Sequence, residues 1–130
     1  MSGTWIDIKA EDGVFGGYLA LPPKGADSGP QGGHGPGIVL IQEIFGVNEH
    51  IRAVADQYAL DGYVVLAPDL FWRKGHRTDL GYGPADFQTG LVTTRGVLID
   101  RARARIEPDV GPESQYTALA LIVTEMLERA

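Results

Sequence analysis

The order of apolar and polar residues near the N-terminus predicts a β-hairpin. Residues 5–10 alternate in polarity and place Ile6 and Ile8 on one face, as in a half-buried strand. Glu11-Asp12-Gly13 has the composition of a tight turn, and residues 14–21 form a second apolar stretch that ends at two prolines. We therefore expect an antiparallel pair of strands at the start of the chain.

Two later apolar runs predict a parallel βαβ unit. Residues 38–41 and residues 63–67 are apolar throughout, a pattern typical of strands buried on both faces. Between them, Asn48 suits the N-cap of a helix and Gly62 suits its C-terminal cap. Strand, helix and strand joined by short connections form a parallel βαβ unit, so the expected fold class is α/β. One stripe of the helix has the spacing of a core-facing surface: Ile51, Val54, Ala55, Tyr58 and Ala59.

The segment between the hairpin and this unit is predicted to be a surface loop. Residues 24–36 are rich in Gly and Pro and show no periodicity. The glycines within residues 32–35 are not preceded by a strand or followed by a helix, so they do not predict a phosphate-binding loop.

The second half of the chain is predicted to be a polar loop followed by helices. Residues 69–83 carry aromatic side chains in a polar setting, and residues 85–107 have a helical pattern that Gly and Thr interrupt between residues 90 and 96. A further helical stripe lies within residues 108–130. We divide the chain into a domain of residues 1–107 and a divergent segment of residues 108–130.

Composition limits the classes of function. The chain has 130 residues, a net charge of -6 and 44% hydrophobic residues, the values of an ordinary soluble domain. Its one basic run, Arg101, Arg103 and Arg105, scatters around a helix, so we expect no nucleic-acid partner. No apolar run approaches the length of a membrane span, and the N-terminus lacks a signal-peptide pattern. We therefore expect no membrane partner and a cytoplasmic location.

Two carboxylates follow the predicted parallel strands directly. Glu43 comes after the first strand and Asp69 after the second, so both lie at the sheet edge where α/β folds bind ligands. Asp69 follows a proline and is more often an acceptor that organises its loop than a catalytic acid. Glu43 precedes Ile44 and Phe45, a poor place for a charge without a role. From the residues alone, a structural and a catalytic role for Glu43 both remain open.

The segment Gln42-Glu43-Ile44-Phe45-Gly46-Val47-Asn48 resembles the signature of the dienelactone hydrolase family. Asp61-Gly62-Tyr63 and Ala67-Pro68-Asp69-Leu70 match that family in order and spacing, and the resemblance covers residues 4–107. It implies the N-terminal part of an α/β-hydrolase fold, namely an antiparallel hairpin plus a parallel βαβ unit flanked by helices. Family members cleave dienelactone or other small esters and lactones, and we expect no cofactor.

The resemblance also implies roles for individual residues. The glutamate at position 43 would contact the catalytic thiol of the family, and the backbone N–H of Ile44 would form half of the oxyanion hole. Family members hold a substrate carboxylate with arginine, and Arg73 and Arg77 lie in the corresponding loop. With Tyr82, they are the predicted substrate-binding residues.

The same resemblance predicts that this chain has no nucleophile. A nucleophile elbow reads G-x-S-x-G or G-x-C-x-G between a strand and a helix. The chain has no cysteine, and its serines are Ser2, Ser28 and Ser114, of which Ser114 lacks the second glycine of an elbow. We therefore expect a family member truncated before the elbow. Because the members of a triad act as a unit, we expect this chain alone to be inactive.

A second hypothesis is a non-catalytic protein that self-associates or binds a partner. A sheet that stops short has an unpaired edge and exposed apolar surface, which favour pairing with another chain. A third hypothesis, a small-ligand module built on Glu43 and the Phe71-Trp72 loop, rests on those residues alone. We expect no metal site, because the three histidines lack ligand spacing and are expected in solvent: His34, His50 and His76.

Overall fold

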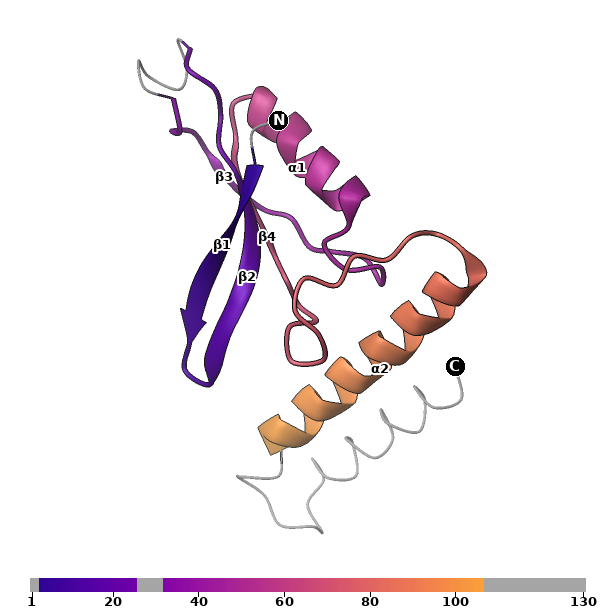
Figure 1. The fold of residues 1–130 in the computed structure, drawn as a ribbon. Coiled ribbons are helices and arrows are strands. Elements are labelled where there is room, and N and C mark those ends of the chain that lie inside the picture. The colour runs from indigo at the N-terminus through magenta and orange to yellow at the C-terminus, as the bar shows by residue number, and fades with distance from the viewer. Residues whose placement is uncertain (1–2, 26–31, 107–130) are drawn as a thin grey trace.

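A mixed four-stranded sheet with one helix on its face forms the centre of the protein (Figure 1). The computed structural model describes residues 3–25 and 32–106. The strand order is β1-β2-β4-β3. The strands are β1 (Gly3–Ala10), β2 (Gly13–Ala20), β3 (Gly37–Val39) and β4 (Val64–Pro68), and the helices are α1 (Glu49–Leu60) and α2 (Pro84–Ile106).

The pairing of the strands confirms the predicted hairpin and the βαβ unit. β1 and β2 are antiparallel, and Ala10 lies opposite Gly13 across a two-residue turn. β2 also pairs antiparallel with β4, whereas β4 and β3 are parallel, with Ile38 opposite Val65. The fold is therefore α/β, as predicted, and the carboxyl ends of β3 and β4 lie at one edge of the sheet.

Helix α1 begins and ends where the sequence predicts. The Asn48 side chain accepts a hydrogen bond from the Ile51 N–H at 3.1 Å and so caps the N-terminus. Gly62 follows the last turn with a φ of +99° and donates its N–H to the Ala59 carbonyl at 3.0 Å. Ile51, Ala55 and Ala59 are buried, but Tyr58 is 43% exposed, so the buried stripe is narrower than predicted.

The core lies between α1 and the sheet. It consists of small and aliphatic side chains that let the helix approach β4 closely, together with one tyrosine of β2. The Tyr18 hydroxyl donates to the Asp56 carboxylate of α1 at 3.0 Å, and burial together with this carboxylate raises the pKa of Tyr18. The buried cluster is Tyr18, Ala20, Val47, Ile51, Ala55, Ala59, Val65 and Ala67.

The prediction that residues 38–41 are buried on both faces was wrong. The strand is only three residues long, and Val39 is 65% exposed while Ile41 is 57% exposed. The reason is that, within residues 3–25 and 32–106, β3 is an edge strand and α1 covers only one face of the sheet. Ile38, which lies opposite Val65, packs on the core, whereas Val39 lies on the other face. A continuous apolar run indicates a strand but does not establish what covers it.

The predicted interruption between residues 90 and 96 was also wrong, because α2 is one continuous helix. Two threonines in this stretch and one directly before it donate their hydroxyls to the carbonyls four residues earlier, at distances from 2.8 to 3.0 Å. This arrangement satisfies the side chains within the helix. In Figure 1, α2 lies apart from the strands and beside the loops that follow β3 and β4. The threonines are Thr89, Thr93 and Thr94.

The predicted segment 108–130, and with it the division of the chain after residue 107, lies outside the described residues. Within the described ranges, no helix is long and apolar enough to cross a membrane.

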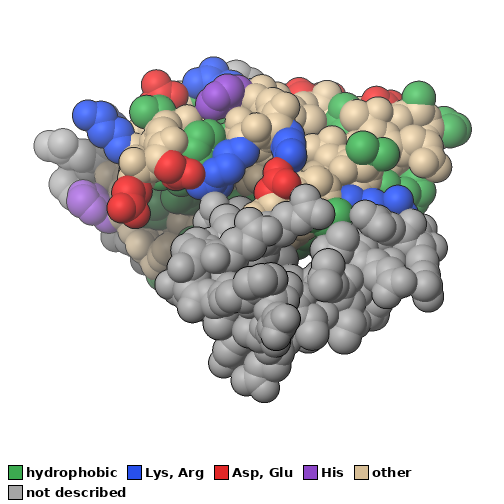
Figure 2. Space-filling view, turned by 90° about the horizontal axis from the view of Figure 1, so that it is seen from below, with side chains coloured by type: hydrophobic (Ala, Val, Ile, Leu, Met, Phe, Trp, Pro, Cys, Tyr) green, Lys and Arg blue, Asp and Glu red, His purple; other side chains and the backbone are tan. Residues whose placement is uncertain are grey.

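On the face shown in Figure 2, basic and acidic side chains are interspersed rather than separated by sign.

Candidate functional site

The chain makes a tight turn directly after β3, at the carboxyl edge of the sheet. The Gly46 N–H donates to the Glu43 carbonyl at 3.3 Å, which closes a β-turn with Ile44 at its second position. Gly46 has a φ of +81°, and a Cβ there would lie 2.1 Å from the Thr78 carbonyl oxygen. Both observations require glycine at this position.

The peptide between Glu43 and Ile44 is held from its carbonyl side. The Gln42 side-chain amide donates to the Glu43 carbonyl at 3.2 Å, and its oxygen accepts from the Leu70 N–H at 2.9 Å. Gln42 thereby links the loops that follow β3 and β4. Because C=O and N–H point in opposite directions in a trans peptide, the Ile44 N–H is directed out of the turn. Among the described residues, it has no acceptor.

Glu43 and Ile44 line a cavity of about 230 Å³ between the sheet edge and α2. Glu43 is exposed, and its carboxylate has no hydrogen-bond partner among the described residues. The sequence left a structural role for Glu43 open. In the described part of the chain, no contact of its carboxylate supports such a role. The cavity is lined by Gln42, Glu43, Ile44, Leu70, Phe71, Thr94, Val97 and Leu98.

Asp69 has the loop-organising role that the sequence favoured. It is 1% exposed, and its carboxylate accepts the Phe71 N–H at 3.0 Å and the Arg77 N–H at 2.7 Å. Arg77 has a left-handed φ of +53°, an unfavourable conformation that this hydrogen bond helps to hold. Asp69 therefore shapes the loop after β4, and both of its oxygens are engaged by that loop.

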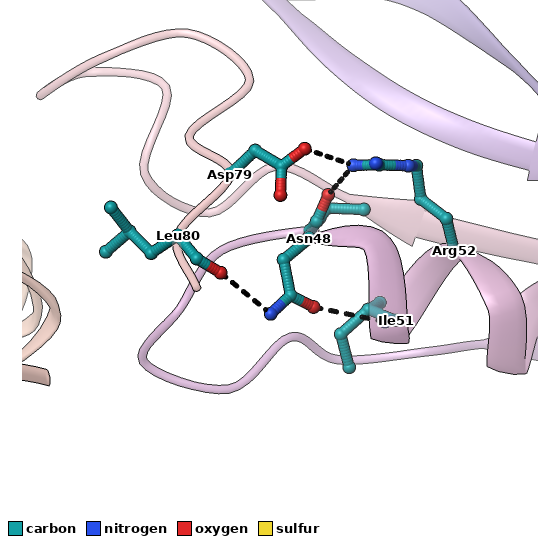
Figure 3. Close-up of polar contacts among 6 residues, drawn as sticks. Asn48, Ile51, Arg52, Asp79 and Leu80 are labelled. Carbon is teal, nitrogen blue, oxygen red and sulfur yellow. Dashed lines mark hydrogen bonds and ion pairs between the residues drawn. The ribbon is translucent and has the colours of Figure 1, made fainter. Parts of the chain in front are cut away.

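A second set of contacts fixes the turn to residues 78–80 (Figure 3). Asn48 is 2% exposed, and the same amide that caps α1 donates to the Leu80 carbonyl at 3.1 Å. Arg52 donates to the Val47 carbonyl at 2.9 Å and to the Asp79 carboxylate at 3.0 Å. The start of α1 therefore holds both the turn and the neighbouring loop.

Tyr82 lies beside a different cavity, of about 540 Å³, at the N-terminus of α1. Its ring packs edge-on against Phe45 at 4.6 Å and faces His50 at 6.3 Å. Although this cavity is larger, it contains neither Glu43 nor Ile44. The structure therefore separates Tyr82 from these two residues, and its predicted role in substrate binding stays a prediction.

The two predicted substrate-binding arginines contact the β1–β2 hairpin. Arg73 makes a bidentate contact with Asp12, with a closest distance of 2.7 Å, and its guanidinium lies 4.1 Å from the Trp72 ring. Arg77 lies 3.8 Å from the Asp7 carboxylate. Neither arginine lines the cavity of Glu43 and Ile44. A role in substrate binding stays a prediction for both.

The contribution of α2 to the cavity of Glu43 and Ile44 was not predicted from the sequence. Gly90 lies against the Ile44 carbonyl, and Thr94, Val97 and Leu98 form one wall of the cavity. The signal was the Gly- and Thr-rich stretch, which we interpreted as a break in the helix. Small residues within a helical pattern also mark places where a backbone approaches another segment closely.

Within the described parts of the chain, no three His, Cys, Asp or Glu side chains are grouped so that they could hold a metal ion. His34, His50 and His76 are all exposed, as expected from the sequence.

Comparison with known proteins decides the family. The model of the dienelactone hydrolase family matches residues 15–117, which is most of the chain. The chain belongs to the dienelactone hydrolase family. This result confirms the resemblance carried by residues 42–48, and membership of this family supports a hydrolase function.

Individual family members agree with this assignment. A candidate carboxymethylenebutenolidase of Synechocystis sp. is 37% identical over 119 residues, which cover 85% of this chain and 46% of that protein. One of Azospirillum brasilense is 46% identical over 72 residues, or 55% of this chain and 28% of that protein. The chain thus spans less than half the length of these relatives.

A solved structure confirms the fold as part of that of a dienelactone hydrolase. The structure named m3DLH superposes with a TM-score of 0.52 at 29% identity and covers 77% of this chain and 36% of that one. The sheet and helices described above therefore correspond to part of a larger α/β-hydrolase domain.

Proposed function

We propose that this chain supplies the oxyanion-binding half of a hydrolase of small carboxylic esters or lactones. The observation that carries the proposal is the Glu43–Ile44 peptide, held at its carbonyl by Gly46 and Gln42 while the Ile44 N–H has no acceptor among the described residues. When a nucleophile attacks an ester or lactone carbonyl, negative charge develops on its oxygen. A fixed N–H aimed at that oxygen stabilises the charge without reorganisation.

Glu43 is the second residue of the proposed site. It lines the same cavity as Ile44 and has no structural partner in the described part of the chain. In this proposal its carboxylate faces the nucleophile, the role that the family resemblance implies. The cavity volume of about 230 Å³ suits a small substrate rather than a polymer.

The 130 residues alone are proposed to bind such a substrate without turning it over. They contain no cysteine, and Ser2, Ser28 and Ser114 all lie outside the described residues. Nucleophile and base act together, so binding by an oxyanion donor alone gives little turnover. A cytoplasmic location stays a prediction from the sequence.

The test uses two substitutions at position 44 that differ in the backbone N–H. Ile44→Pro removes the N–H, and proline is favoured at the second position of a β-turn, so the turn is retained. Ile44→Val keeps the N–H and serves as the control. We would titrate the ¹⁵N-labelled chain with γ-butyrolactone, a small lactone, and follow the amide resonance of Gly46.

We expect saturable binding in the wild type and in Ile44→Val. We expect roughly tenfold weaker binding in Ile44→Pro, the loss of one hydrogen bond worth about 1.4 kcal/mol. Equal affinity in all three would exclude the Ile44 N–H as the oxygen-binding donor. Hydrolysis of 4-nitrophenyl acetate above the buffer rate by the wild-type chain would contradict the proposed inactivity.

A second candidate function, self-association or binding of a partner strand, is favoured by the edge at β3, which pairs with no further strand among the described residues. Val39 and Ile41 are exposed there at 65% and 57%, and no charge interrupts residues 37–41. Concentration-dependent sedimentation that Val39→Lys abolishes would support this candidate. A chain that stays monomeric and binds the lactone would support the hydrolase proposal.

A further inference from the structure

Helix α2 touches the Ile44 turn through its backbone. Gly90 is buried, and a Cβ at this position would lie 2.3 Å from the Ile44 carbonyl oxygen and 3.4 Å from the Ile44 Cβ. The first distance is far inside van der Waals contact. The helix therefore approaches this peptide as closely as it does only because residue 90 has no side chain.

The same helix forms one wall of the cavity one to two turns further along. Thr94, Val97 and Leu98 face Glu43 and Ile44 across it, and the Thr94 hydroxyl donates to the Gly90 carbonyl at 2.8 Å. The contact at Gly90 thus sets both the width of the cavity and the position of the peptide that follows the Ile44 N–H.

We propose that Gly90 is a positioning residue: its missing side chain lets α2 rest on the Ile44 carbonyl, which orients the Ile44 N–H and sets the size of substrate that the cavity accepts. The contact between Gly90 and the Ile44 carbonyl does not depend on what the cavity binds. The statement that the oriented Ile44 N–H binds an ester or lactone rests on the proposed function.

The chain offers a matched control on the same helix. Gly90→Ala places a methyl group against backbone and requires a displacement of about 1 Å to reach ordinary contact distance. Gly96→Ala makes the same chemical change with the same gain in helix propensity. Its methyl group meets the Lys74 Cε at 3.2 Å, the far end of a flexible side chain.

The experiment compares the amide spectra of three ¹⁵N-labelled 130-residue chains: wild type, Gly90→Ala and Gly96→Ala. We expect Gly90→Ala to shift the Ile44 and Phe45 amide resonances by many linewidths and to weaken γ-butyrolactone binding severalfold. We expect Gly96→Ala to leave both unchanged. A merely stabilising role of the glycine would alter the melting temperature and leave the lactone affinity as it is.

Identical Ile44 resonances in the two alanine variants, or lactone binding that is measurable and equally tight in both, would overturn the proposal. If Gly90→Ala does not fold, the contact is tested in the wild-type chain by measuring cross-relaxation between a Gly90 α proton and the Ile44 β proton. Absence of this cross-relaxation would also overturn the proposal. A shifted Ile44 resonance in Gly90→Ala combined with no lactone binding in any chain would uphold the packing and reject the proposed function instead.

Discussion

The two helices are held in place by different kinds of contact. α1 buries Ile51, Ala55 and Ala59 against the sheet, whereas α2 rests on loops and leaves Val92 and Leu98 exposed at 66% and 48%. An apolar stripe therefore determines where α1 lies, and a point of close backbone approach determines where α2 lies.

The polar anchors of the helices differ in the same way. α1 is tied to the sheet by the Tyr18–Asp56 hydrogen bond, in which the tyrosine is 6% exposed. α2 is tied to the loop after β4 by Lys74 and Asp100, whose side chains are 40% and 53% exposed. Because solvent screens exposed ion pairs, the second anchor contributes no more than about 1 kcal/mol.

The largest effect on stability is expected from a substitution in the apolar contact between α1 and the sheet. Ile51→Ala on α1 should lower the free energy of unfolding by about 2–5 kcal/mol, because it removes a buried side chain and leaves a cavity. Val92→Ala on α2 should change it by no more than about 0.5 kcal/mol, since that side chain is already in solvent. Urea denaturation monitored by circular dichroism measures both.

Leu60→Ala provides the control within α1, because Leu60 is 61% exposed at the last position of that helix. It should behave like Val92→Ala. If all three substitutions cost the same, burial against the sheet does not distinguish the helices.

A smaller effect is expected where α1 meets the turn of residues 43–46. Asn48→Ala removes the N-cap and should cost about 0.5–2 kcal/mol. Asn48→Ser keeps a cap acceptor but is too short to reach the Leu80 carbonyl. Amide hydrogen exchange should therefore show Ile51 protected in the serine variant and exposed in the alanine variant, with residues 80–82 exchanging faster in both. Unchanged exchange at residues 80–82 would contradict the link through Asn48.

The smallest effect appears only at high pH and concerns the anchor of α1. Since the pKa of Tyr18 is raised above its ordinary value of 10.0, the unfolded chain loses the tyrosine proton first as pH rises. The stabilisation is complete below pH 10 and is lost above it, by up to about 1.4 kcal/mol per pH unit until the folded pKa is reached. Tyr18→Phe should remove this slope from urea-denaturation data, whereas Tyr82→Phe, at an exposed tyrosine, should retain it.

The parts of the fold that the sequence predicted are those set by local rules. The hairpin follows from alternating polarity around Glu11 and Asp12, and α1 follows from its stripe and its Asn48 and Gly62 caps. The exposure of Val39 could not be predicted from the apolar residues 38–41, because burial depends on whether another element covers that face of the sheet. The continuity of α2 was not predicted because Gly90 has a low helix propensity. In the structure, the missing side chain of Gly90 permits the close approach of α2 to Ile44.

The site was predictable to a similar extent. Glu43 and Ile44 were predicted through the motif that contains them, and the structure brings them to one cavity, while their catalytic roles stay predictions. The second bond of Asn48 and the bridge made by Gln42 join segments about 30 residues apart along the chain, at separations of 32 and 28 residues. No local pattern encodes such distances. Arg73 and Arg77 contact hairpin carboxylates that are more remote still in sequence, at a separation of 61 residues for Arg73 and Asp12.

The order of the contacts along the chain has a consequence for synthesis on the ribosome. Every residue of the buried cluster lies between Tyr18 and Ala67, so the core is complete once β4 has emerged. Gly90, which rests on the Ile44 peptide, follows β4 by 22 residues. At about 5–20 residues per second, translation supplies it roughly 1–4 seconds later. A nascent chain thus acquires its core before the turn at Ile44 is fully enclosed.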